Sequence, residues 1–482
     1  MMAHPLKSVR FCRSASCIAA LVALSAVPGA VAQVSQAAAF VHQDWVARYN
    51  GAFSYWEEAH DVALGDGCVY VTGFEYEADY STAFATVKYD YVGRQVWARG
   101  YGLNGPNSSA QAKALAVDAT GHVFVTGWSY EYDPTPPETI RCDAATLKYD
   151  PDGNLLWEHR YRLPGINNQP QDIAIDRFGN AYVAGAAWVG DGFDLMLLKY
   201  SPDGALLWDR TIGKTGDRWD AGYAVAIGPD DNPVVGGYTE PFILNPLVYG
   251  YLVKYSASGN LLWQRDHESA SNCSTWWRVA INSAGQIYAL GQIAPPGELC
   301  HVWTSQYSAS GTLLWDRHYD GNAGGENYAR GMALTPTDGV VVCGTSDDFN
   351  SQGAVQSIVT IRYEPDGTEL WRRLDRGGYD QAQGRDVAVD AAGNAYVTGF
   401  GFNDNDNLDF VTLKYTPVGG LAWIERFDGQ GLNDIPIRIA VDDAQNVFVA
   451  GDTHGGLAND YDFGTIRYRQ RSRPLIHALQ DP

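Results

Sequence analysis

The chain has 482 residues, of which 45% are hydrophobic and 12% aromatic, and its formal net charge at pH 7 is −22. Such an acidic composition excludes nucleic acids and anionic membranes as expected partners, because both require clusters of lysine and arginine. It suits a solvated surface on an exported protein, and it is also compatible with cations or basic partners.

The first 32 residues predict a secretory signal peptide. Basic residues precede an apolar segment at 18–27, and Ala30 and Ala32 form a small-residue cleavage site before Gln33. The apolar segment is too short to span a bilayer, and no later segment approaches 18 apolar residues. We therefore expect a protein without a membrane span that is secreted, either extracellular or periplasmic, with residues 33–43 leading into the fold.

From residue 44 onwards, a tryptophan recurs within a repeated pattern of the type Tyr-Asp-Pro-Asp-Gly-x-Leu-Leu-Trp. Successive tryptophans are 51 to 60 residues apart. Periods of this size indicate an array of units that bury their apolar faces against one another. The tryptophans of the repeat are Trp45, Trp97, Trp157, Trp208, Trp263, Trp315, Trp371 and Trp423.

Three further landmarks recur in step with the tryptophan: an apolar-Ala-apolar motif, a segment ending in glycine and a segment ending in tyrosine. Each is short, rich in Val, Tyr and Thr, and bounded by Asp-Gly or Ala-Gly turns, as in β-hairpins. Each unit is therefore predicted to hold four antiparallel strands, A (Ala), B (Gly), C (Tyr) and D (Trp). Eight such units predict an all-β fold, a single eight-bladed β-propeller over residues 44–468.

The phase of the repeat predicts how the ring closes. The predicted mature chain begins with a D strand at 44–49, and the last unit ends with a C strand at Tyr468, before a tail at 469–482. We expect the first strand to complete the last blade, because this closure leaves no unpaired terminal edge.

The segments Val389–Gly399 and Lys199–Gly204 resemble the bacterial β-propeller repeat called SBBP, and the related delta-60 repeat. The resemblance covers about residues 40–468. It implies a surface or secreted propeller and no particular reaction. The family name suggests seven blades, whereas the chain has eight repeats. The Gly-x-x-x-Trp spacing also resembles the docking motif of quinoprotein dehydrogenases, but no Cys-Cys dipeptide is present, so that resemblance extends to blade packing only.

No catalytic motif stands out in the sequence. The histidines lack the spacing of transition-metal ligands, and neither a nucleophile elbow nor a phosphate loop is present. Glu57 and Glu58 are a candidate acid/base pair, although adjacent carboxylates are common on acidic surfaces. We therefore expect a binding protein rather than an enzyme.

One acidic loop is a candidate calcium site, and no other cofactor is expected. Residues 403–409 offer oxygen ligands at alternate positions, but lack the glycine and the closing glutamate of a complete calcium loop. The candidate ligands are Asp404, Asp406 and Asp409. For Asp409 the alternative is a turn cap, because aspartate also precedes strand C in other units.

The D–A and B–C loops are long and diverse, whereas the A–B and C–D turns are short. Antiparallel strand order places both long loops on one face, where binding usually resides. We expect this face to bind a protein or a glycan, as a monomer. The alternative is a secreted lyase or hydrolase with its site at the axial mouth of the same face.

Six tryptophans fall in or beside these long loops. Their rings could stack on sugars or anchor a protein, or could fold inward as small loop cores. They are Trp56, Trp128, Trp188, Trp219, Trp276 and Trp277.

The predicted mature chain has an odd number of cysteines, so at least one thiol is expected to be free or paired between molecules. Cys273 and Cys300 lie in loops beside strands A and B of the fifth unit. We expect these two to form a disulfide in an oxidising compartment.

Overall fold

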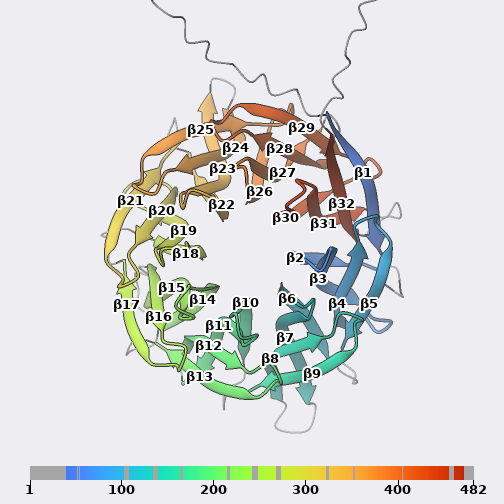
Figure 1. Ribbon diagram of the computed structural model, residues 1–482, viewed down its shortest axis with the longest axis vertical. Coiled ribbons are helices and arrows are strands. Elements are labelled where there is room, and N and C mark those ends of the chain that lie inside the picture. Colours follow the sequence, from blue (N-terminus) through green and yellow to red (C-terminus); the bar gives the residue numbers. More distant parts are fainter. Residues whose placement is uncertain are drawn as a thin grey trace, which may run out of the picture. The chain divides into compact units, whose positions relative to one another are not determined.

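The computed structural model describes residues 40–51, 53, 55–102, 108–133, 139–162, 167–190, 192–213, 218–241, 248–267, 273–321, 325–350, 353–403, 405, 407–454 and 461–471. The described strands form eight four-stranded antiparallel sheets, arranged as blades around an axis (Figure 1). The predicted eight-bladed β-propeller is thus confirmed. The predicted signal peptide lies outside the described residues, among which no helix is long and apolar enough to cross a membrane.

The blades follow one another along the chain, each running from the axis outwards. Blade 1 contains β2 (Glu58–Gly65), β3 (Cys68–Tyr76), β4 (Thr82–Asp90) and β5 (Gln95–Tyr101). Blade 2 contains β6 (Ser109–Val117), β7 (Val123–Asp133), β8 (Thr139–Tyr149) and β9 (Leu155–Tyr161). Blade 3 contains β10 (Asn168–Ile175), β11 (Ala181–Val189), β12 (Gly192–Tyr200) and β13 (Leu206–Ile212). Blade 4 contains β14 (Arg218–Ile227), β15 (Pro233–Pro241), β16 (Tyr249–Tyr255) and β17 (Leu261–Asp266).

The second half of the ring has the same organisation. Blade 5 contains β18 (Cys273–Ile281), β19 (Ile287–Ala294), β20 (His301–Tyr307) and β21 (Leu313–Tyr319). Blade 6 contains β22 (Asn327–Leu334), β23 (Val340–Asn350), β24 (Gly353–Tyr363) and β25 (Glu369–Asp375). Blade 7 contains β26 (Ala382–Val389), β27 (Ala395–Phe402), β28 (Leu408–Tyr415) and β29 (Leu421–Phe427). Blade 8 contains β30 (Ile435–Val441), β31 (Val447–His454), β32 (Tyr461–Arg471) and β1 (Phe40–Tyr49).

The ring closes through the first strand, as predicted. β1 pairs antiparallel with β32, from Phe40 opposite Arg471 to Tyr49 opposite Phe463. The strand starts at Phe40, before the expected start at residue 44. The Trp45 indole donates a hydrogen bond to the Tyr91 carbonyl of blade 1 at 3.1 Å, which joins the two ends of the ring.

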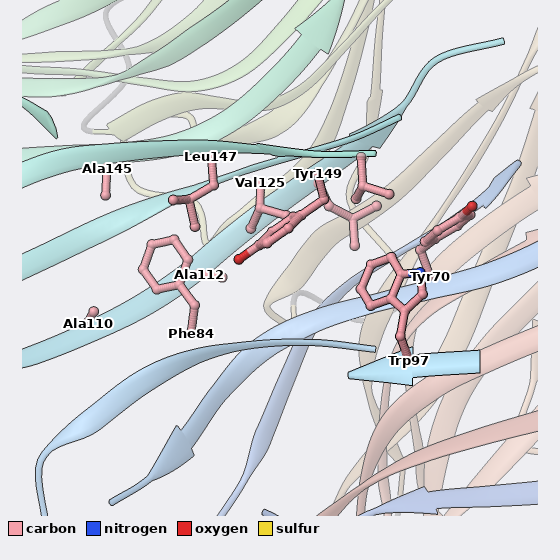
Figure 2. Packing of buried hydrophobic residues seen from close by; sticks show 11 residues of the cluster. Tyr70, Phe84, Trp97, Ala110, Ala112, Val125, Ala145, Leu147 and Tyr149 are labelled. Atoms are coloured by element: carbon pink, nitrogen blue, oxygen red, sulfur yellow. The ribbon is translucent and has the colours of Figure 1, made fainter. Parts of the chain in front are cut away.

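The repeated tryptophan and glycine hold neighbouring blades together. The Trp97 indole of blade 1 donates to the Pro151 carbonyl of blade 2 at 3.0 Å, and its ring packs between Tyr70 and Tyr149 (Figure 2). Gly153 has a φ of 80°, and a Cβ there would lie 2.8 Å from the Trp97 ring. Glycine is therefore needed both for the turn, as predicted, and for the close approach of the preceding blade.

The alanine of the A strands fits the narrow side of each blade. In β2, Ala63 packs against the apolar cluster shared with blade 2, whereas Val62 and Leu64 pack towards blade 8. Blades converge at the axis, so only a methyl group fits on one sheet face. The A strands accordingly form the innermost circle in Figure 1.

Candidate functional site

The A strands share an irregularity that the sequence analysis did not predict. Each contains a β-bulge three residues before the alanine of its apolar-Ala-apolar motif, so that one extra residue is left out of the pairing. The bulged residues remain at least partly accessible to solvent although their strands are innermost, and they form a ring around the axis. This bulge ring consists of His60, Lys113, Gln171, Tyr223, Trp277, Arg330, Arg385 and Ile437.

The position after the bulge carries charged residues that converge on the axis. Arg438 and Asp61 form an ion pair at 3.3 Å. Arg438 also lowers the pKa of Arg278 to about 10, together with burial, while Asp386 and other carboxylates oppose this shift. The axial charge cluster, defined by position after the bulge, consists of Asp61, Asp172, Arg278, Asp386 and Arg438.

The carboxylates of this cluster also join adjacent blades. Asp61 accepts a hydrogen bond from the Leu115 amide at 3.0 Å, and Asp172 accepts one from the Val225 amide at 2.8 Å. Asp386 accepts the equivalent bond from the Ile439 amide at 3.2 Å. These contacts give the cluster a structural role in packing the innermost strands.

Stability should depend on pH through Asp172. Burial raises its pKa to about 6, with Asp61 adding to the shift and the Val225 amide and Arg278 opposing it. The unfolded pKa is about 3.9, so the folded state binds more protons between these values. The free energy of unfolding should therefore gain about 1–2 kcal/mol from this group as pH falls from 7 to 5. Urea denaturation at pH 7 and 5 should show this gain, and Asp172→Asn should lack it; an equal gain in the variant contradicts the assignment.

The six predicted loop tryptophans occupy different environments. Trp56 and Trp219 are 47% and 39% exposed. Trp128, Trp188 and Trp277 are half-buried. The ring centroids of Trp56 and Tyr461 are 5.3 Å apart, and those of Trp219 and Phe193 are 5.9 Å apart.

Trp276 requires a correction, because it is only 1% exposed and cannot contact a ligand on the loop face. Its ring stacks on Trp303 at 3.4 Å within the core between blades 4 and 5. It precedes the bulge in β18, a position that points into the blade interface and holds Ala, Gly or Pro in all other blades. Gly250 makes room for it, since a Cβ there would lie 2.8 Å from the Trp276 ring.

A cleft opens between blades 2 and 3 on the long-loop face. Its volume is about 590 Å³. Two aromatic rings from β7 lie on one wall, and polar side chains from β6 and from the start of β10 line the rest. This blade 2–3 cleft is lined by Lys113, Trp128, Tyr130, Cys142, Asn167, Gln169 and Gln171.

Several polar groups of the cleft lack protein partners. Within the described part of the chain, Lys113, Trp128, Tyr130 and Gln171 form no side-chain hydrogen bond or ion pair. Gln169 donates to Asn167 at 3.1 Å. Burial lowers the pKa of Lys113, which Glu58 partly opposes. The cleft therefore presents an indole, a phenol, an amide and an ammonium group to solvent, where a ligand can bind them.

The Cys142 thiol at the edge of the cleft is not set up as a nucleophile. Burial raises its pKa to about 11, while a hydrogen bond to the Asn168 backbone opposes the shift. Cysteine reacts as the thiolate, so this thiol stays protonated at neutral pH.

A second cavity, of about 480 Å³, lies on the opposite face, among the short turns of blades 2 and 3. Its polar groups are already used within the turns. Asp118 accepts hydrogen bonds from Thr120 and His122, and Lys148 donates to the Pro202 carbonyl at 3.0 Å. This cavity therefore offers a ligand fewer free groups than the blade 2–3 cleft.

The candidate calcium ligands Asp404 and Asp406 lie outside the described residues. Asp409 accepts hydrogen bonds from Tyr379 at 3.1 Å and Asn403 at 3.0 Å, which agrees with a capping role. Its carboxylate also lies near those of Asp428 and Asp434, with one oxygen of each within 4.8 Å of the others. Acidic groups of this kind are common without an ion, so calcium binding stays a prediction.

The Cys273 side chain also lies outside the described residues. Its backbone pairs with Ala294 in β18 and β19. The disulfide between Cys273 and Cys300 therefore stays a prediction.

Among the residues that line the cleft, the sequence analysis singled out Trp128 as a candidate and did not consider Lys113 or Gln171. Both occupy the bulge of their A strand, directly after a buried residue. The available signal was the repeated register: the bulge positions vary in chemistry from unit to unit, whereas the residue before each of them is small or apolar.

Known proteins resemble the chain mainly in fold. A virginiamycin B lyase from Staphylococcus aureus has a TM-score of 0.43 and 13% identity, covering 74% of this chain and 94% of the lyase. An ulvan lyase has a TM-score of 0.41 and 10% identity, covering 76% and 90%. Drosophila Plexin A, in complex with Semaphorin 1b, has a TM-score of 0.39 and 9% identity, covering 89% and 88%. These similarities are too low to carry an argument about function.

No curated protein sequence matches the chain. Residues 164–193, which run from the end of the D–A loop through β10 and β11 into β12, match the SBBP β-propeller repeat. This match confirms the resemblance seen in the sequence. The chain is an eight-bladed β-propeller that carries the SBBP β-propeller repeat.

Proposed function

We propose that the protein binds glycans in the blade 2–3 cleft. The observation that carries this proposal is the pairing of Trp128 and Tyr130 with unpartnered polar groups in one cavity of about 590 Å³. Small-molecule sites usually have volumes of about 300–1,000 Å³, with a few polar groups that orient the ligand.

The chemistry of the lining suits a sugar. Aromatic rings provide large apolar surfaces on which the carbon face of a sugar ring can stack, and the Trp128 indole adds an N–H donor. The amide of Gln171 can donate and accept hydrogen bonds, which matches the dual character of sugar hydroxyl groups. Lys113, which lies in the innermost strand β6, supplies a further donor.

A protein partner is the other ligand class considered for this face. Protein interfaces bury roughly 800 Å² on each partner and are organised around exposed anchor residues. Trp56 and its neighbour Tyr461 are placed for such a role, but a concave cleft with unpartnered donors suits a small polar ligand better. We therefore favour the glycan.

The alternative of an axial lyase or hydrolase finds less support in the geometry. The Asp172 and Asp386 carboxylates bind backbone amides of the next blade. Glu58 is 3.3 Å from His60, whose other ring nitrogen contacts the Ala112 carbonyl. The carboxylates of Asp172, Asp386 and Glu58 thus have protein partners. Within the described part of the chain, the side chains of Trp128, Tyr130 and Gln171 in the cleft form no hydrogen bond.

A glycan array probed with the purified protein and with Trp128→Ala tests the proposal. The wild-type protein should bind a defined set of glycans, and the variant should lose these signals, because stacking on the indole is removed. Trp219→Ala is the matched control, since it removes an exposed tryptophan elsewhere on the face. Absence of binding to any glycan, or retention by Trp128→Ala, would contradict the proposal. Release of new reducing or unsaturated ends from a bound glycan would support the enzyme instead.

A further inference from the structure

The bulge ring has an unusual charge for this protein. Among its eight positions are Lys113, Arg330 and Arg385, and none is a carboxylate. The whole chain has 56 acidic and 34 basic residues, so a ring without acids differs from the rest of the molecule. The bulge ring itself therefore carries positive charge, whereas the next position along the same strands holds three carboxylates beside two arginines. Cations of the ring that lack a carboxylate partner favour the approach of anions.

Two of these cations are neighbours. Arg330 and Arg385 occupy the bulges of β22 and β26, the adjacent innermost strands of blades 6 and 7 (Figure 1). Arg385 lies over the Phe400 ring at 4.9 Å, and Arg330 over the Tyr328 ring at 5.8 Å. Each guanidinium is thus supported on one face by an aromatic ring, which leaves its N–H groups for another ligand.

No protein acceptor neutralises this pair. Within the described part of the chain, neither arginine forms an ion pair or a side-chain hydrogen bond, and Nε of Arg385 is buried without an acceptor. A buried donor that lacks a partner is costly in free energy. An anion between the two guanidinium groups would satisfy these donors.

The electrostatics of the pair agree with this geometry. Burial lowers the pKa of Arg385 to about 10, and repulsion from Arg330 adds to the shift. Asp452 opposes it, but burial raises the pKa of Asp452 well above its usual range, which weakens this carboxyl as a source of negative charge. Asp386, the residue next to Arg385, accepts a hydrogen bond from the Ile439 amide and interacts electrostatically with Arg438 and Arg278.

We infer that Arg330 and Arg385 form an oxyanion site that takes a sulfate or carboxylate group beside the axis, on the innermost strands of blades 6 and 7. Guanidinium groups bind such groups through paired, charge-assisted hydrogen bonds. The group can come from a free anion or from an acidic glycan. The second source rests on the proposed function and would make the natural ligand a sulfated or uronic-acid glycan.

The site is tested with inorganic sulfate. Wild-type protein should bind sulfate at low ionic strength, measured by calorimetry and by the rise in Tm relative to chloride at equal ionic strength. The double variant Arg330→Gln/Arg385→Gln should bind it at least about fivefold more weakly while keeping its fold. The control Arg94→Gln/Arg376→Gln removes two exposed positive charges away from the axis and should behave as wild type. Equal sulfate binding by the axial variant, or none by the wild type, overturns the site.

The source of the anion is tested with a galacturonic acid tetrasaccharide and its methyl ester, which lacks the negative charges and carries a methyl group on each carboxyl. If the anion belongs to an acidic glycan, the wild type should bind the free acid more tightly than the methyl ester. Arg330→Gln/Arg385→Gln should bind the two forms equally. Trp128→Ala should weaken both forms equally. If the wild type binds sulfate but does not prefer the free acid over the methyl ester, the proposal that the anion belongs to an acidic glycan is wrong. The oxyanion site itself is then still supported. If the preference persists without the two arginines, the assignment to this pair fails.

Discussion

A chain that begins at Gly51, and so lacks β1, is expected to lose at least about 3 kcal/mol of unfolding free energy or to fail to fold. The truncation leaves β32 as an exposed edge strand and removes Trp45, which contacts Phe448 of blade 8 and Tyr89 of blade 1. Removing a fully buried tryptophan costs about 3–5 kcal/mol; Trp45 is half-buried, so its loss contributes part of the expected change and the unpaired β32 contributes the rest. Urea denaturation against the chain beginning at Gln33 measures the difference.

The loss of unfolding free energy should result from the missing pairing of β1 with β32, and it should be reversible. A synthetic peptide of residues 40–49 should restore stability to the truncated chain, because it supplies the missing partner of β32. The same peptide with Trp45→Ala should do so less well. An unchanged Tm in the truncated chain contradicts closure by β1.

Trp276→Ala is expected to lower the unfolding free energy by about 3–5 kcal/mol, the usual cost of emptying a buried tryptophan site. The ring fills the space left by Gly250 and stacks on Trp303, and no nearby side chain can replace it. Thermal and urea denaturation measure the change.

Trp56→Ala is the matched control for this prediction, since its ring is 47% exposed. Its effect should stay near the roughly 0.5 kcal/mol typical of surface substitutions. A loss comparable with that of Trp276→Ala would show that Trp56 belongs to a loop core. A small effect of Trp276→Ala would contradict the burial of its ring.

The blades were predictable because the repeat encodes them redundantly. Trp97, Gly153 and Tyr149 recur with fixed spacing in the chain, and each landmark has one packing role that the structure confirms. Closure followed from the phase of the same repeat. Because the pattern occurs eight times, strand order and blade number can be predicted from the sequence without knowledge of which residues are in contact.

The site was less predictable because it depends on single-residue register. A bulge changes the direction of one side chain within its strand, and no local signal in the sequence marks it. Trp276 and Trp277 are adjacent, yet the first is fully buried between blades 4 and 5, whereas the second is half-buried and packs against the core of blades 5 and 6. The sequence predicted tryptophans in or beside the long loops. The residues that line the cleft together with Trp128, however, come from two different blades.

The central claim is that the blade 2–3 cleft binds the ligand. It is tested by titrating the glycan that binds most tightly on the array into three proteins. Calorimetry with wild type, Trp128→Ala and Trp56→Ala compares the cleft with the exposed aromatic group near blade 8. We predict that Trp128→Ala raises Kd at least about tenfold, equivalent to about 1.4 kcal/mol, while Trp56→Ala binds as wild type. Loss of binding in Trp56→Ala with full binding in Trp128→Ala would contradict the account.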